Sequence, residues 1–346
     1  MLPTVRAIEV GYGYTKWVQA ADGDAIKTRC FPSIAPVKGN KAIAEALGRK
    51  RETVVIPIDG IEYEVGEDAR LAQGHFNGRN TDDDFCLTPE YLALTRGAMA
   101  YMGVEQIDLL VVGLPVSTFY SKRQALAARM EGAHELPGGR TLHVRRVLVL
   151  AQPHGALAAY GLTQKGLLAT RTTRNLVIDC GSRTFDWLVT EGFKTLEQKS
   201  HAVNRGMIDV VESIAEGISH DIGQRYSDFD RIDRALRTGA SLRVLGRTVN
   251  LSKHLKVAHR IAMDAVQELK RKVDAATDID NIIIAGGGAF FFRSKIEEGF
   301  PRHQVRVLED SMMANVLGFQ TIGMEIESAR MATNGAPVSR QPANVP

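Results

Sequence analysis

Residues 175–187, Asn-Leu-Val-Ile-Asp-Cys-Gly-Ser-Arg-Thr-Phe-Asp-Trp, place a carboxylate where an apolar strand runs into a tight turn. A second strand leaves this turn at 185–187. Small and hydroxylated residues in such a turn present backbone N–H groups and hydroxyls to phosphate oxygens, and Asp179 is placed to hold a divalent cation through water. The same residues also describe an ordinary β-hairpin. The interpretation therefore depends on a second copy of the pattern.

The second copy lies at the N-terminus. Val5–Val10 is predicted to be a buried strand that carries Glu9, and the turn Gly11-Tyr-Gly-Tyr-Thr-Lys16 and a strand at 17–20 follow it. Glycines allow the backbone to approach an anion closely, and Lys16 supplies a cation for phosphate charge. Taken alone, this segment also fits a glycine-rich hairpin with an exposed lysine. Together, the two hairpins predict a pair of phosphate-binding turns that face each other across a cleft.

Composition restricts the class of protein. The chain has 346 residues, of which 44% are hydrophobic and 24% charged, as expected for a globular protein with two domains or two lobes. A net charge of +3 argues against a protein that coats nucleic acid. The cysteines, Cys30, Cys86 and Cys180, are spaced too widely to predict a disulfide framework or a zinc site. Without a signal-peptide pattern or a long apolar run, a cytoplasmic protein is expected.

Strands and helices alternate along the rest of the chain, which predicts an α/β fold. We expect a first lobe at 1–150, a second at 151–309, a C-terminal helix at 310–328 that returns to the first lobe, and a disordered tail at 329–346. The predicted strands include 107–113, 141–150, 195–203 and 281–285, the predicted helices include 89–102, 119–131, 155–161, 252–275, 289–298 and 312–324, a turn is predicted at 135–140, and 165–174 is the predicted crossover.

Three further segments carry candidate ligand-binding or metal-binding residues. Gly286-Gly287-Gly288 lies between a strand and a helix, where backbone N–H groups form an anion or nucleotide subsite. Gln152 lies at the exposed end of a buried strand, where α/β proteins carry functional side chains. The nearby His154 is expected to be solvated or to cap the helix. Asp82-Asp83-Asp84 is expected to be a solvated loop rather than a metal site.

In this order, the segments resemble the actin/Hsp70/sugar-kinase ATPase superfamily, and within it the plasmid-segregation actins of the ParM/StbA type, with the ParM-like proteins of PRTRC-type gene clusters as the nearest pattern. Residues 8–16 resemble the first phosphate motif, 179–186 the second, 152–156 the first connector, 284–288 the adenosine motif and 311–318 the second connector. The resemblance implies an actin-like (ribonuclease H-like) fold with two similar lobes around a nucleotide cleft, and ATP or ADP with Mg²⁺ as cofactors.

The resemblance also implies roles for individual residues. Asp179 would hold Mg²⁺ through water, together with Glu9, and Gln152 would orient the attacking water. The β- and γ-phosphates would be contacted by Gly11, Tyr12, Gly13, Tyr14, Thr15 and Lys16 from the first turn and by Gly181, Ser182, Arg183 and Thr184 from the second. Gly286, Gly287 and Gly288 would contact the α-phosphate and adenosine, and Gly206 the ribose.

Two positions depart from the family pattern. Glu9 stands where the first motif usually has Asp, and its extra methylene shifts the carboxylate by roughly a bond length. Arg183 stands where glycine is common. Its side chain either points to solvent or adds a cation at the phosphates. The first alternative is favoured, because a bulky side chain in the turn would crowd the phosphate.

The resemblance implies a slow ATPase that forms head-to-tail filaments and segregates plasmid DNA, with a DNA-binding adaptor and without direct contact to nucleic acid or membrane. A small-molecule kinase is an alternative, with Asp186 or Asp209 as its base, although Asp186 is expected to tie its own hairpin together. A nucleotide-gated adaptor with negligible hydrolysis is a further alternative. A chaperone is not expected, because no length remains for a peptide-binding domain.

Overall fold

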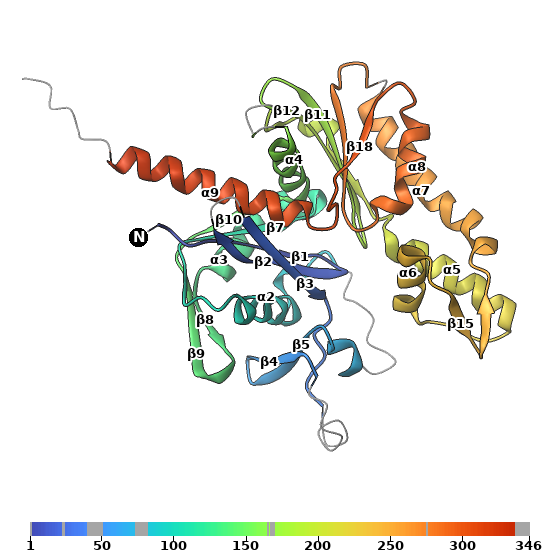
Figure 1. Cartoon of the computed structure of the whole chain (residues 1–346), viewed down its shortest axis with the longest axis horizontal. Helices are drawn as coiled ribbons and strands as arrows, with labels where there is room; N and C mark the ends of the chain where they lie inside the picture. Colours follow the sequence, from blue (N-terminus) through green and yellow to red (C-terminus); the bar gives the residue numbers. More distant parts are fainter. Residues whose placement is uncertain are drawn as a thin grey trace, which may run out of the picture.

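The computed structural model describes residues 2–22, 25–39, 51–72, 82–164, 166, 170–274 and 276–335, with side chains up to 333. The chain forms two lobes, each built on a mixed β-sheet with helices packed against it (Figure 1). This is the two-lobed α/β architecture that the two predicted hairpins indicate. In the described residues, no helix is both long enough and apolar enough to span a bilayer.

The first sheet has the strand order β10-β7-β1-β2-β3. Its centre is the antiparallel hairpin of β1 and β2, and β7 and β10 extend it in parallel. Both β1 and β7 are almost entirely buried, which explains their continuous apolar runs. The strands are β1 (Val5–Val10), β2 (Tyr14–Asp22), β3 (Ala25–Pro32), β7 (Leu109–Leu114) and β10 (Val147–Ala151).

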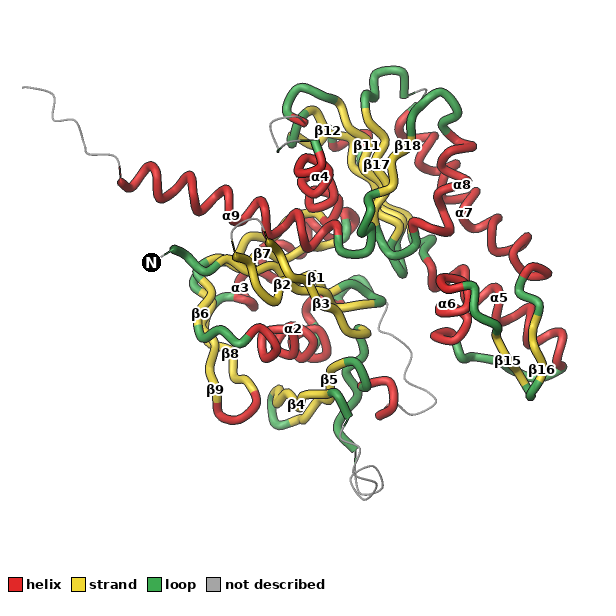
Figure 2. Tube along the Cα trace, in the orientation of Figure 1, coloured by secondary structure: helices red, strands yellow, loops and turns green. Residues whose placement is uncertain are grey.

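The second sheet repeats this arrangement. The antiparallel hairpin of β11 and β12 lies at its centre, and β17 and β18 extend it in parallel, in the order β13-β12-β11-β17-β18, with β14 beside β12 (Figure 2). The strands are β11 (Arg174–Cys180), β12 (Phe185–Glu191), β13 (Lys194–Thr195), β14 (His201–Val203), β17 (Asn281–Ala285) and β18 (Val305–Val307). The two hairpins predicted to bind phosphate therefore occupy equivalent places in the two lobes.

Helices and smaller sheets complete the lobes. The helices are α2 (Pro89–Met102), α3 (Val116–Met130), α4 (Gln152–Thr163), α5 (Met207–Ile222), α6 (Phe229–Thr238), α7 (Ser252–Val273), α8 (Ala289–Gly299) and α9 (Ala314–Gly335). The remaining strands are β4 (Thr53–Ile58), β5 (Ile61–Gly66), β6 (Gln106–Ile107), β8 (Gly132–Leu136), β9 (Arg140–Val144), β15 (Leu242–Val244) and β16 (Arg247–Val249). Short 3₁₀ turns lie at Ala69–Ala72, Phe85–Leu87, Pro137–Gly139 and Glu197–Lys199.

Helices α4 and α9 cross between the lobes at an unusually short distance. A Cβ atom on Gly318 of α9 would lie 1.8 Å from the carbonyl oxygen of Gly155 in α4, and a Cβ on Gly155 would lie 2.3 Å from the carbonyl oxygen of Asn315. Helix α4 follows the first sheet and packs on β11 and β17 of the second, whereas α9 packs back on β1 and β7. Both glycines are needed for this crossing, which joins the lobes.

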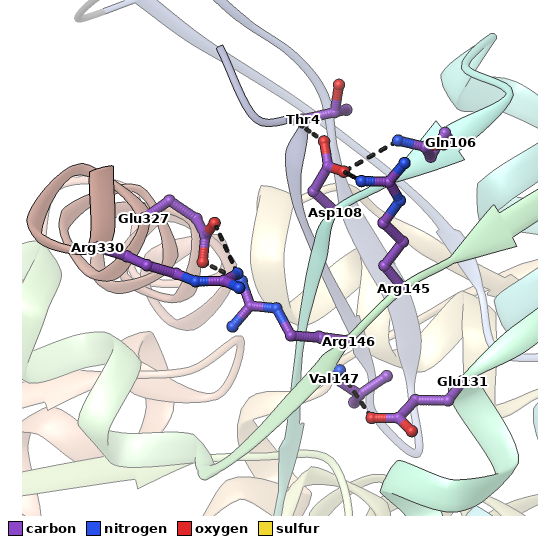
Figure 3. Close-up of polar contacts among 9 residues, drawn as sticks. All are labelled: Thr4, Gln106, Asp108, Glu131, Arg145, Arg146, Val147, Glu327 and Arg330. Atoms are coloured by element: carbon purple, nitrogen blue, oxygen red, sulfur yellow. Dashed lines mark hydrogen bonds and ion pairs between the residues drawn. The ribbon is translucent and has the colours of Figure 1, made fainter. Parts of the chain in front are cut away.

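Helix α9 continues beyond its predicted end. The prediction ended the helix at 324 and placed a disordered tail from 329, but α9 runs to Gly335 and projects past the first sheet (Figure 1). Residues 325–332 favour helices, and the buried Glu327 carboxylate pairs with Arg146 and Arg330, as Figure 3 shows. The predicted tail at 336–346 lies outside the described residues.

Other predicted boundaries are wrong for physical reasons. The single strand predicted at 141–150 is β9 and β10, which belong to different sheets. The predicted turn at 135–140 includes the end of β8, and the predicted strand at 195–203 is split into β13 and β14 by a 3₁₀ turn. Helix α6 was not predicted, because only Ile232 and Ala235 of this charged helix are buried. The predicted crossover at 165–174 lies partly outside the described residues.

The α4–α9 crossing yields a stability prediction. Gly318→Ala is expected to destabilise the protein by about 2 kcal/mol or more, because the new methyl group meets backbone atoms that cannot move aside. A drop of several degrees in the melting temperature, followed by circular dichroism, tests this. Gly39→Ala is the matched control, since nothing lies within 4 Å of its Cβ position. Equal melting temperatures for the two variants would contradict the prediction.

Candidate functional site

The two glycine-containing turns meet in one cavity between the lobes. The first turn joins β1 to β2, and the second joins β11 to β12. A Cβ atom on Gly13 would lie 2.0 Å from the hydroxyl oxygen of Ser182, so the turns are in contact. Most of the predicted site residues line this cavity, namely Glu9, Gly11, Tyr12, Gly13, Tyr14, Lys16, Gln152, Asp179, Gly181, Ser182, Thr184, Gly286 and Gly287.

Backbone N–H groups without partners concentrate at these turns. Within the described part of the chain, the N–H groups of Tyr12, Gly13, Ser182 and Arg183 donate to no protein acceptor, whereas Gly11 N and Gly181 N close the turns themselves. Backbone N–H groups need acceptors when water is excluded. Successive N–H groups in a turn form a concave anion site. The geometry therefore provides an anion site on each side of the cavity.

A buried polar network forms the floor of the cavity. Lys16 Nζ donates to Glu9 Oε2 at 2.9 Å, and the amide of Asn315 donates to both Glu9 Oε1 at 3.0 Å and Asp179 Oδ2 at 2.6 Å. These side chains come from the first lobe, the second lobe and α9, and all four are buried. Asn315 thus bridges two carboxylates that belong to different lobes.

Burial disfavours the charged form of the Asp179 carboxylate. Desolvation, and then the charge of Glu9, raises the pKa of Asp179 to about 6. A cation beside the carboxylate reverses this effect, because it favours the charged form. In the described residues no group of three His, Cys, Asp or Glu side chains is placed to hold a metal ion. A divalent cation beside Asp179 and Glu9 would therefore take its other ligands from water and phosphate, which Mg²⁺ prefers.

Asp186 ties its own hairpin together, as expected, through a side-chain hydrogen bond with Thr184, and it also joins the two lobes. Its Oδ1 accepts a hydrogen bond of 2.7 Å from the backbone N–H of Val116, at the start of α3 in the first lobe. Complete burial, and then the charge of Asp179, raises the pKa of Asp186 to about 7. Asp209, the other carboxylate considered as a base, accepts the N–H of Gly206 at 2.8 Å and so stabilises the start of α5.

Gln152 directly follows β10, at the end of a strand as predicted, and it is the first residue of α4. It is buried and reaches the cavity, which leaves the predicted water-positioning role open to test. His154 is not a solvated residue as expected. Its Nε2 lies 3.0 Å from Thr195 Oγ1, and burial lowers its pKa to about 4, so the imidazole stays neutral.

Arg183 follows neither alternative that the sequence left open. Its side chain is only 18% exposed, and its Nη1 donates to Asp83 Oδ1 at 2.7 Å and to Tyr12 Oη at 3.1 Å. The guanidinium thus crosses from the second lobe to the first and does not line the cavity. Asp83 and Asp84 are largely exposed, as predicted for this loop, and each also forms an ion pair, Asp83 with Arg183 and Asp84 with Lys122.

Three other predicted ligand residues lie beside the cavity rather than in its wall. Thr15 is buried, with its hydroxyl 3.0 Å from that of Ser33. Gly206 precedes α5, whose first N–H groups donate to the carbonyl oxygens of Gly181 at 3.2 Å and Ser182 at 2.7 Å. Gly288 N donates to the carbonyl oxygen of Cys180. These residues support the second turn and the neighbouring strand from behind.

Three residues at the site were not predicted from the sequence. Asn315 belongs to the segment identified as the second connector, but only the fold brings it between the carboxylates. Arg237 lies on the helix that was not predicted, donates to the carbonyl oxygen of Gly287, and lies with its guanidinium carbon 5.1 Å from the Phe290 ring centroid. Met312 lines the cavity beside Gly287. Met312 and Asn315 both lie in the connector segment 311–318, whereas no local pattern marks Arg237.

Two family models match the chain. "Actin like proteins N terminal domain" matches residues 7–155, and "Archaeal actin homologue MreB-like, C-terminal" matches residues 177–298. Proteins described as archaeal actin homologs from Thermoplasma volcanium and Thermoplasma acidophilum are each 27% identical over 337 residues, which is 91% of this chain and 97% of theirs.

Solved structures agree with this fold. The crystal structure of Ta0583, an archaeal actin homolog, superposes with a TM-score of 0.74 at 23% identity, over 94% of this chain and 100% of the other. The ADP complex of that protein gives 0.71 at 22% identity, with the same coverage. A 15-stranded ParM filament from Clostridium botulinum gives 0.73 at 18% identity, over 94% and 100%. The predicted actin-like, two-lobed fold is confirmed, and the nearer resemblance to PRTRC-type proteins stays a prediction.

The buried Asp186 yields a prediction for stability against pH. Because burial raises its folded-state pKa, its contribution to stability is complete below the ordinary aspartate pKa and is lost as the pH rises through about 7. Asp186→Asn keeps an acceptor for Val116 N–H but cannot ionise. Its stability should therefore fall less than that of the wild type between about pH 5 and pH 8, by about 1 kcal/mol or more.

Thermal melting at both pH values measures this difference. The exposed Asp264→Asn is the control, and it is expected to keep the wild-type profile. An unchanged profile in Asp186→Asn would show that ionisation of Asp186 does not limit stability.

Proposed function

The chain belongs to the actin-like proteins, and from this we propose that it binds Mg-ATP between its lobes, hydrolyses it slowly and assembles into filaments. The observation that carries the proposal is the pair of contacting turns, whose N–H groups at Tyr12, Gly13, Ser182 and Arg183 have no acceptor within the described residues. Such N–H groups suit the phosphate oxygens of a nucleotide. The relative that was crystallised with ADP has the same fold.

The residues of the cavity fit phosphoryl transfer, which depends mainly on positioning and on neutralising charge. Asp179 and Glu9 would hold Mg²⁺ through water, and the ion supplies charge neutralisation at the β- and γ-phosphates when bound. Lys16 adds a cation at the first turn. Gln152, buried at the start of α4, would orient the attacking water, because an amide is a poor base but a good hydrogen-bonding partner.

Arg237 and Gly287 would form the nucleoside end of the site. Both line the cavity, and the Arg237 guanidinium, which donates to the Gly287 carbonyl oxygen, is a planar cation that could stack on a base. The structures of filament-forming ParM proteins share the fold, which supports self-assembly as the use of this site. A head-to-tail contact is heterologous and therefore gives open filaments. Plasmid segregation through a DNA-binding adaptor belongs to this proposal.

The two carboxylates considered as the base of a kinase, Asp186 and Asp209, do not support that alternative. Asp186 is held by Val116 N–H and Asp209 by Gly206 N–H, so each carboxylate already has a structural role. If the protein binds ATP but does not hydrolyse it, the nucleotide-gated adaptor is the better description.

Sedimentation and light scattering with ATP, ADP and no nucleotide test the assembly. We expect filaments that pellet with Mg-ATP, that are visible by negative-stain electron microscopy, and that disappear as ATP is consumed. Protein that binds or hydrolyses ATP without assembling would refute the filament proposal and leave nucleotide binding standing.

Two variants test the chemistry. Gln152→Ala is expected to lower kcat for ATP hydrolysis about tenfold or more, with little change in ATP affinity, because it removes only the group that orients water. Asp179→Asn is expected to abolish the Mg²⁺ dependence of ATP binding. Gln164→Ala, at the other, exposed end of α4, is the matched control and should keep wild-type kinetics. Wild-type turnover in Gln152→Ala would reject this role.

A further inference from the structure

We infer that Arg183 is a positioning residue, which clasps the second lobe to the first beside the cleft and thereby slows nucleotide exchange. The inference rests on the proposed nucleotide function. The clasp consists of Arg183 from the second turn and Tyr12 and Asp83 from the first lobe. Arg183 was singled out in the sequence as an unusual residue for a phosphate turn, and the proposed phosphate and water-positioning roles leave its side chain without a function.

The clasp joins the two phosphate turns directly. Tyr12 belongs to the first turn and Arg183 to the second, and the guanidinium carbon lies 5.1 Å from the centroid of the Tyr12 ring. A hydrogen bond and a cation–π contact thus act between the same two side chains. Any separation of the turns must break these contacts.

The first-lobe side of the clasp is itself well anchored. The Tyr12 hydroxyl also donates to the carbonyl oxygen of Asp82 at 3.3 Å, and the Tyr12 ring stacks on Phe85 with a centroid distance of 5.4 Å. Tyr12 is 9% exposed and Phe85 5%. Arg183 therefore contacts a side chain that is firmly held in the first lobe.

The position of the clasp connects it to nucleotide exchange. The clasp joins the two turns that line the cavity from opposite lobes. A nucleotide can enter or leave only when the turns move apart. Because the clasp is broken in that open form and made in the closed form, it favours the closed form and lowers the rate of exchange.

The expected effect is moderate. The Asp83 carboxylate is 68% exposed, so salt screens its attraction for Arg183, and the partly buried contact with Tyr12 adds to it. We expect loss of the clasp to raise the nucleotide dissociation rate about threefold to tenfold. Screening predicts that the wild-type rate also rises with salt, whereas the rate of a variant without the charge pair rises less.

The adjacent carboxylate provides a matched control. Asp84 pairs with Lys122 of α3, so both partners lie in the first lobe, and its side chain is 71% exposed, close to the 68% of Asp83. Asp83→Asn and Asp84→Asn therefore remove one ion pair each from neighbouring, equally solvated positions. Only the Asp83 pair crosses between the lobes.

The experiment measures the release of a fluorescent ATP analogue from full-length protein by stopped flow. We expect faster release from Asp83→Asn and Arg183→Gln, wild-type release from Asp84→Asn, and partial recovery in Arg183→Lys, which keeps the charge but not the planar stacking. The double variant Asp83→Asn/Arg183→Gln should release no faster than Arg183→Gln alone, because both changes break one contact. Equal release rates in all variants, with nucleotide bound, overturn the clasp.

A second measurement does not depend on nucleotide. Hydrogen exchange of the free protein is expected to be faster at residues 11–13 and 182–184 in Arg183→Gln and Asp83→Asn than in Asp84→Asn, at equal melting temperatures. If the wild type binds no nucleotide but this difference is present, the proposed function fails while the clasp stands. If nucleotide binds and exchange rates are equal, the clasp fails and the proposed function stands.

Discussion

The close crossing of α4 and α9 is the constraint on which the arrangement of the lobes depends. Gly155 and Gly318 bring the two helix backbones into contact, and no larger residue fits at either position. Helix α4 carries the chain from the first sheet onto the second, and α9 returns it to the first. Gln152 and Asn315 lie next to this crossing, so the same contact that joins the lobes also places Gln152 at the cavity and Asn315 between the Glu9 and Asp179 carboxylates.

Around this crossing, polar side chains connect the two lobes. Asn315 bridges Glu9 and Asp179, Asp186 accepts the N–H of Val116, and Arg183 reaches Tyr12 and Asp83. Such contacts are short in range and depend on orientation. They can therefore be broken and remade when the lobes move, whereas the sheets behind them stay packed. An interface of this kind suits a protein whose cleft must open for its ligand.

Much of the fold follows from local patterns. The hairpins β1–β2 and β11–β12 were predicted because buried strands alternate with glycine turns, and α2 was predicted over the residues that the structure assigns to it. Errors arose where local patterns are silent. Helix α6 buries only two residues, and the strand predicted at 141–150 is divided between two sheets at Arg145 and Arg146. The charged residues of α6 leave too few apolar positions for a helical pattern. The pattern of apolar residues along a strand does not show which sheet that strand joins.

The sequence by itself determined the two phosphate turns and the carboxylates beside them, because a turn's chemistry lies within a few consecutive residues. Only the tertiary structure decided the partners of these groups. Asn315 lies 306 residues from Glu9 along the chain, and Arg183 lies 100 residues from Asp83 and 171 from Tyr12. The donor–acceptor distance of a hydrogen bond varies by only a few tenths of an ångström. Side chains so far apart in sequence reach that precision only when two lobes and a connecting helix have packed together.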